Sequence, residues 1–268
     1  MAGTPRVEYI KAVSHLMDET RKFLDGLNVI PRQTSPADSI LLALVSKSII
    51  LTEAIVVLVA NGFADEAYGL CRTSVEIELT VRYLTNDDVI KRCNRYFLYF
   101  TKDKSEWIRL IQKYYPDLDL KRPADADELD KLAAAYPNPH RWSECPDGVK
   151  GFAAEPSTSV KRDDGSPSDQ LFTYEVLYKW MSHYVHGTIT SIDPAHITIP
   201  GDRFRIHPGA GLSNRGKAAL RTSFLNVHMN MSRVLRYFNM DIPEFLGSEY
   251  ENVVALIRDG STKESKIS

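Results

Sequence analysis

Residues 62–84 read GFADEAYGLCRTSVEIELTVRYL, and this stretch decides the fold because it carries two stripes of apolar residues at helical spacing. At about 100° per residue, the first stripe contains Leu70, Ser74, Ile77, Val81 and Leu84. The opposite stripe contains Arg72, Glu76, Leu79 and Tyr83. A helix with apolar residues on both sides is buried among other helices. The stretch therefore predicts a helix at the centre of a helical bundle.

Helical patterns continue on both sides of this stretch. Upstream, Pro36 follows Ser35 at a predicted helix start, and Gly62 follows Asn61 at the predicted end of that helix. The other predicted helices cover about 6–24, from the cap at 85–88 to about 116, 169–185 and 213–239. The short connections between the first four helices indicate antiparallel neighbours. We predict that residues 1–268 form a single, mainly α-helical domain.

Three segments depart from the helical pattern. Residues 116–168 hold seven of the 14 prolines and predict a long Pro-rich insertion or lid within the domain. Residues 196–208, HITIPGDRFRIHP, alternate apolar and polar residues about a PGD turn and predict a small β-hairpin. The tail at 261–268 is polar and is expected to fray. The predicted fold class is therefore mainly α, a helical bundle with this insertion and hairpin.

The overall charge and the cysteines exclude several classes of protein. The 268 residues carry a net charge of -2, so no global field attracts nucleic acid or an anionic membrane. The three cysteines are far apart and form no CxxC pair, which argues against a disulfide framework or a zinc knuckle. The N-terminal residues lack the apolar segment of a secretory signal. We expect reduced thiols and a cytoplasmic protein.

One apolar segment, residues 40–60, is about long enough to span a bilayer. Lys47 and Glu53 interrupt it near its middle, where each charge costs roughly 2.5 kcal/mol or more. We therefore expect a buried helix without membrane insertion, in which both charges lie on a narrow polar face or at a subunit seam.

Arg72 and Glu76 are spaced i, i+4 and can pair along their helix. If the pair is exposed, it contributes only a few tenths of a kcal/mol. Leu79 and Tyr83 lie beside the pair, however, and a buried arginine needs a fixed partner. The sequence leaves both interpretations open.

A second polar group occurs in residues 178–188, YKWMSHYVHGT. Ser182 and His186 are one helical turn apart at the edge of a core face, while His183 points further toward solvent. Gly187 is a plausible helix end, where the helix dipole favours the imidazolium form of His186. No GxSxG elbow occurs, so a serine hydrolase is disfavoured.

Metal and nuclease motifs are weak. His183 and His186 form an HxxH pair, but HExxH and the ExxH pairs of di-iron bundles are missing, so we expect neither a metal nor another cofactor. Residues 221–228, RTSFLNVH, have the Arg-to-His spacing of small helical RNases of the HEPN superfamily. In a chain of this composition that spacing arises readily by chance, so it permits a nuclease without indicating one.

Two segments together resemble a known family. GFADEAYGLCRTSVE, residues 62–76, is similar to the signature G-x-x-x-E-A-x-x-L-x-R-x-x-x-E, and YKWMSHYVHG, residues 178–187, is similar to Y-x-x-x-S-x-x-x-H. Both signatures mark a bacterial family of helical proteins without assigned function, distantly HEPN-like and sometimes encoded near mobile or defence genes. The resemblance implies that four residues converge in one polar site: Arg72, Glu76, Ser182 and His186.

Such a site has two chemical uses. Arg72 can hold a phosphate while His186 acts as general acid or base and Ser182 orients it, as in a metal-independent RNase. Alternatively, the cluster fixes helix register in a binding or assembly module. The predicted substrate-binding residues are Tyr83, Tyr178, Tyr184, His183, Arg203 and Arg205, the last two from a basic run at 203–217.

These observations give a ranked set of expectations. The first is a toxin-like or defence-associated factor that cleaves RNA without a metal. The second is a non-enzymatic interaction module that forms a homodimer through the apolar second helix. The third is a small-ligand-binding bundle with a pocket of Tyr83, Tyr174, Tyr178 and Tyr184. RNA and a protein encoded nearby are the other expected partners.

Overall fold

The structure is a computed structural model that describes residues 5–26, 36–118, 178–179, 181–182, 197–198, 205–206 and 214–246. These residues are mainly helical, as the sequence predicts. The helices are α1 (Pro5–Gly26), α2 (Ala37–Ala60), α3 (Ala64–Thr85), α4 (Val89–Tyr114) and α9 (Asn214–Tyr237). Two short strands, β1 (Ile197–Thr198) and β2 (Arg205–Ile206), complete the described elements.

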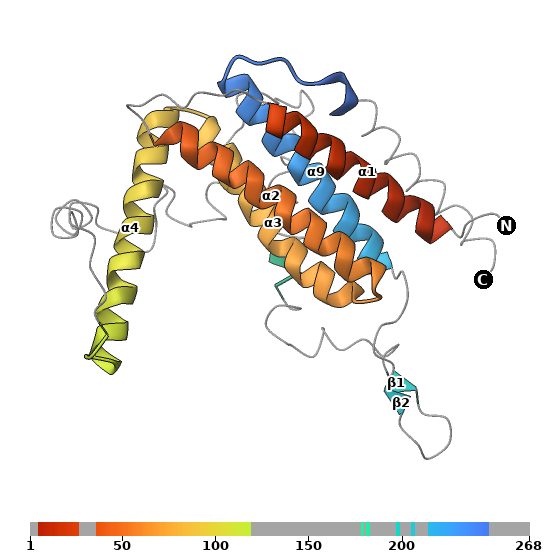
Figure 1. The fold of residues 1–268 in the computed structure, drawn as a ribbon, viewed down its shortest axis with the longest axis horizontal. Helices are drawn as coiled ribbons and strands as arrows, with labels where there is room; N and C mark the ends of the chain where they lie inside the picture. Colours follow the sequence, from red (N-terminus) through yellow and green to blue (C-terminus); the bar gives the residue numbers. More distant parts are fainter. Residues whose placement is uncertain are drawn as a thin grey trace, which may run out of the picture.

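The bundle is built around α3, which packs against both α2 and α9, while α2 and α9 also pack against each other (Figure 1). α1 covers another side of α2. Both apolar stripes of α3 are used, since Ile77 and Val81 on one side and Leu79 and Tyr83 on the other are all buried. This double burial is the physical reason that α3 occupies the centre.

Local signals set the end of α2 and the start of α4 as the sequence predicts, whereas α2 begins at Ala37 with Pro36 in the cap position and not as the first helical residue. The tight connection between α2 and α3 uses Gly62 at a positive φ of 90°, a conformation that glycine adopts without steric cost. Asn61 donates its side-chain amide to the carbonyl of Val57 at 2.8 Å and so satisfies the last turn of α2. Asp88 caps α4 by accepting the backbone N–H of Lys91 at 3.0 Å.

α4 starts at the bundle and then leaves it (Figure 1). Near its start Cys93 is fully buried. Arg92 donates to the backbone carbonyl of Tyr83 at 2.6 Å, and its guanidinium carbon lies 4.0 Å from the centre of the Tyr83 ring. These contacts attach the first turns of α4 to the end of α3.

Buried polar side chains join the three central helices. Asn226 of α9 donates to Ser74 of α3 at 3.1 Å, and Asn230 of α9 donates to Ser48 of α2 at 2.7 Å. All four residues are at most 5% exposed. Because an unpaired polar group is costly in an apolar interior, these bonds favour one register of α9 against its neighbours.

β1 and β2 pair in antiparallel orientation, with Ile197 opposite Ile206 and Thr198 opposite Arg205. The remaining residues of the predicted hairpin lie outside the described residues. The same holds for residues 119–168 of the predicted insertion and for the tail at 261–268.

α2 is the one described helix that is long and apolar enough to cross a membrane. In this structure it packs on α1, α3 and α9, and Lys47 lies on its exposed face. Glu53 forms an ion pair with Arg21 of α1. Lys47 and Glu53 therefore both lie at the surface of the bundle.

Candidate functional site

The site centres on Arg72, in the middle of α3. Its Nε donates to Ser182 Oγ at 3.0 Å, and its Nη2 donates to the hydroxyl of Tyr178. The guanidinium carbon also lies 4.6 Å from the centre of the Tyr178 ring, a cation–π distance. Arg72 thus connects α3 to a segment more than one hundred residues later in the chain.

The partners of Arg72 are held by helical geometry. Residues 178, 179, 181 and 182 have a helical backbone, and Ser182 Oγ donates to the carbonyl of Tyr178 at 2.8 Å. Since its hydrogen is used in that bond, Ser182 Oγ presents a lone pair to Arg72. Met181, between the two hydroxyl residues, is fully buried and anchors the segment in the core.

Glu76 is the carboxylate next to Arg72 on α3. Their closest nitrogen and oxygen atoms are 3.9 Å apart, and the side chains are 23% and 41% exposed respectively. This distance is too long for a hydrogen bond, and such a half-exposed pair contributes little to stability. Glu76 therefore compensates the charge of Arg72 only in part.

α4 contributes Tyr96 to the same neighbourhood. Burial raises the pKa of the Tyr96 phenol, and the negative charge of Glu76 raises it further. Tyr96 packs against the core at the start of α4. Tyr96 was not singled out from the sequence, although its position as an aromatic residue near the start of a predicted helix could have indicated it.

The arrangement is suited to binding an anion. Tyr178 and Ser182 are neutral hydrogen-bond acceptors, so they orient the guanidinium without cancelling its charge. Within the described part of the chain, Arg72 Nη1 has no protein partner, which leaves N–H donors for a ligand. A phosphate or carboxylate fits such a donor pair.

Other predicted site residues fall elsewhere. Tyr83 is only 3% exposed and packs against Arg92. Because Tyr83 lies three turns along α3 from Arg72, it does not join the group that Arg72 forms with Tyr178 and Ser182. Arg205 lies in β2 opposite Thr198, with only its backbone described. Outside the described residues lie His183, Tyr184, His186, Arg203 and Tyr174.

The Arg221 to His228 pair lies on α9. Arg221 is exposed, whereas His228 is partly buried, and burial lowers the pKa of its imidazole. The two residues share a helix face but differ in access to solvent, so the structure does not present them as a joint surface.

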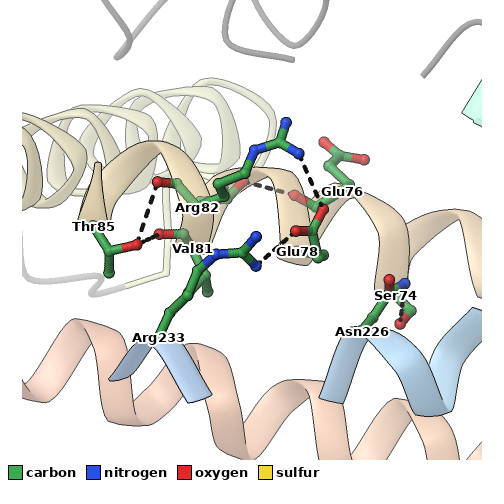
Figure 2. A network of polar contacts seen from close by, with 9 residues as sticks. Ser74, Glu76, Glu78, Val81, Arg82, Thr85, Asn226 and Arg233 are labelled. Atoms are coloured by element: carbon green, nitrogen blue, oxygen red, sulfur yellow. Dashed lines mark hydrogen bonds and ion pairs between the residues drawn. The ribbon is translucent and has the colours of Figure 1, made fainter. Parts of the chain in front are cut away.

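The sequence did not indicate a second ionic network, on α3 and α9 (Figure 2). Arg233 donates to Glu78 at 2.7 Å, and Arg82 lies 3.8 Å from the same carboxylate. Glu78 and Arg82 are 4% and 6% exposed, so this network is far more buried than the Arg72 pair. The i, i+4 spacing of Glu78 and Arg82 was a usable signal, whereas nothing in the sequence assigns Arg233 to them.

Neither a metal-binding cluster nor an activated cysteine is found in the part of the chain that the structure describes. No group of three or more His, Cys, Asp or Glu side chains gathers there. Burial raises the pKa of Cys71 and of Cys93 to about 12, which keeps both thiols protonated and unreactive.

A comparison with family models matches residues 38–203 to DUF5677, a family of unknown function. The match covers more than half of the chain. The chain belongs to this family. The DUF5677 span contains α2 from its second residue onward, α3 and α4, and it includes the four residues that the sequence predicted to form one polar site, Arg72, Glu76, Ser182 and His186. α9 lies beyond it. No curated protein and no solved structure matches the chain.

Proposed function

We propose that this DUF5677 protein is a cytosolic, toxin-like or defence-associated bacterial factor that cleaves RNA without a metal. The observation that carries the proposal is the state of Arg72, a partly exposed guanidinium held by two neutral hydroxyls. Because no carboxylate lies within hydrogen-bond distance of it among the described residues, Arg72 keeps charge and donors for a phosphodiester.

The chemistry assigns one role to each residue. A general base removes the proton of the ribose 2′-hydroxyl, and the 2′-oxygen then attacks phosphorus. The bond from phosphorus to the 5′-oxygen breaks, and that oxygen takes up a proton from the general acid. Arg72 stabilises the extra negative charge on the phosphoryl oxygens, and Tyr178 with Ser182 fixes its orientation. His186, four residues after Ser182 in the sequence, is proposed to take one of these two proton-transfer roles, and water takes the other.

The test is cleavage of several RNA types by the purified protein in the presence of EDTA. Wild type is compared with His186→Ala and Arg72→Ala, and we expect both variants to lose at least about a hundredfold in rate. Arg92→Ala is a matched control, because Arg92 also lies over a tyrosine ring and pairs with a carboxylate, at 3.4 Å from Asp87.

Circular dichroism establishes that each variant is folded. Cleavage that persists in Arg72→Ala, or that disappears equally in Arg92→Ala, contradicts the proposal. If the folded wild type cleaves none of the RNA types, the second candidate takes its place.

That second candidate is a non-enzymatic interaction module. It is favoured by the half of α4 that leaves the bundle, where Trp107 and Tyr114 are 69% and 70% exposed. Large exposed apolar patches commonly mark sites of protein association.

A further inference from the structure

Apolar residues occupy one face of α4 near both of its ends, on either side of the polar residues 101–106. Cys93, Trp107 and Tyr114 are separated by multiples of seven residues, and Tyr96 and Leu110 by two such intervals. A strict seven-residue spacing drifts by only about 20° per repeat around a straight helix. These residues therefore follow one seam along α4.

The bundle uses only the first half of this seam. Cys93 is 0% exposed, and Tyr96 packs against the core. Trp107, Leu110 and Tyr114 belong to the second half of α4 and are 69%, 54% and 70% exposed. This half of the helix leaves the bundle (Figure 1). The elements that α4 packs against, α2 and α3, meet its first half only. Among the described helices, none covers the second half in the way that α2 and α3 cover the first.

The exposed area is large for a single chain. Tyr115 and Leu118, at the end of α4, are 64% and 49% exposed and extend the patch. At about 200 Å² for each aromatic side chain and about two-thirds exposure, the three rings contribute roughly 400 Å², and the two half-exposed leucines add on the order of 100 Å². This total lies in the upper part of the range that ordinary monomers expose. Two such patches together cover on the order of 1,000 Å², the lower limit of a specific interface.

The seam is complementary to itself in an antiparallel pair. A two-fold axis between Leu110 and Ile111 places Trp107 opposite the partner's Tyr114, and Leu110 opposite the partner's Ile111. The same axis places Lys113 opposite the partner's Ile108, so Lys113 faces an uncharged side chain and is not repelled by a second basic residue. In this pairing aromatic rings pack at both ends of the interface and aliphatic side chains pack in its middle, so that large and small side chains can interdigitate.

We propose that two copies of this chain associate through the second halves of their α4 helices, paired antiparallel about Leu110 and Ile111. This surface differs from the outer face of α2, where the sequence led us to expect a dimer. The proposal does not depend on RNA cleavage, so each can fail without the other.

The test measures mass in solution by light scattering and sedimentation at micromolar concentrations. We expect a dimer for the wild type, and for Leu110→Glu a dissociation constant at least about tenfold higher. Val57→Glu is the matched control, because Val57 is 60% exposed on the outer face of α2. Both positions are exposed, so both variants should fold.

A monomeric wild type overturns the proposal, as does a dimer that Leu110→Glu leaves intact or that Val57→Glu dissociates. Cross-linking tests the register independently. Leu110→Cys should join two chains through a short bis-maleimide, whereas Asn94→Cys, exposed on the first half of α4, should not. Equal cross-linking at both positions contradicts the antiparallel pairing.

Discussion

Replacing Glu78 by glutamine should destabilise the protein by about 3 kcal/mol or more. The Glu78 side chain is 4% exposed and faces two arginines, Arg233 at 2.7 Å and Arg82 at 3.8 Å (Figure 2). At an effective dielectric constant near 20, a charge pair about 4 Å apart gains roughly 4 kcal/mol, of which desolvation offsets a large part. Glutamine keeps the shape and removes the charge, which leaves two arginines near each other in a low-dielectric interior.

Glu76→Gln is the control for this experiment, since it lies two residues away on the same helix. Glu76 is 41% exposed and 3.9 Å from Arg72, so its loss should cost less than about 1 kcal/mol. Urea unfolding followed by far-UV circular dichroism measures both free energies of unfolding, with the slope m checking that unfolding stays two-state.

A second substitution tests the cause. Arg233→Met in the Glu78→Gln background removes one uncompensated charge and should restore part of the lost stability. Equal costs for the substitutions at Glu78 and Glu76, or no recovery in the double variant, would refute the role given to burial.

Three further predictions concern buried groups. Burial lowers the pKa of His228 below its ordinary value of 6.5, so the unfolded chain binds the proton more readily than the folded chain does. The free energy of unfolding should therefore be highest above about pH 6.5 and should decline as the pH falls through the folded-state pKa. His228→Gln should flatten this pH dependence when it is measured by urea titration. Cys71 and Cys93, with pKa values raised to about 12, should resist a thiol reagent at mildly alkaline pH until denaturant is added, and rapid labelling of either in the folded chain would contradict their burial. Ser48→Ala removes the buried acceptor of Asn230 and should cost about 1–3 kcal/mol in urea unfolding, whereas an unchanged midpoint would contradict the register role of this bond.

The periodicity of the sequence predicted the helices and the central place of α3, because a buried helix face requires apolar residues three or four positions apart. It misplaced Tyr83 for a related reason. Tyr83 and Arg72 share a stripe, but eleven residues at 1.5 Å per residue separate them by roughly 16 Å along the axis. Angular position alone therefore suggested a shared pocket that the length of the helix prevents.

Contacts between helices were harder to predict. No sequence spacing assigns Arg233 of α9 to Glu78 of α3, because the register of two packed helices depends on all the side chains between them. The seam of α4 shows the same limit, since an apolar face looks alike in a sequence whether another helix covers it or not. The contact of Arg72 with Ser182 was expected only through the resemblance to a family, and the role of this cluster stays a prediction.

The two arginine environments of α3 differ in the property that matters for function. Arg82 lies beside the buried carboxylate of Glu78, which also pairs with Arg233 of α9, so the charge of Arg82 is compensated within the fold. Arg72 is oriented by hydroxyls that carry no charge, and it is 23% exposed. A protein that needed Arg72 only as a structural link would be better stabilised by a close carboxylate partner than by Glu76 at 3.9 Å. The incomplete compensation at Arg72 is therefore the feature that favours an anionic ligand at this position over a purely structural role.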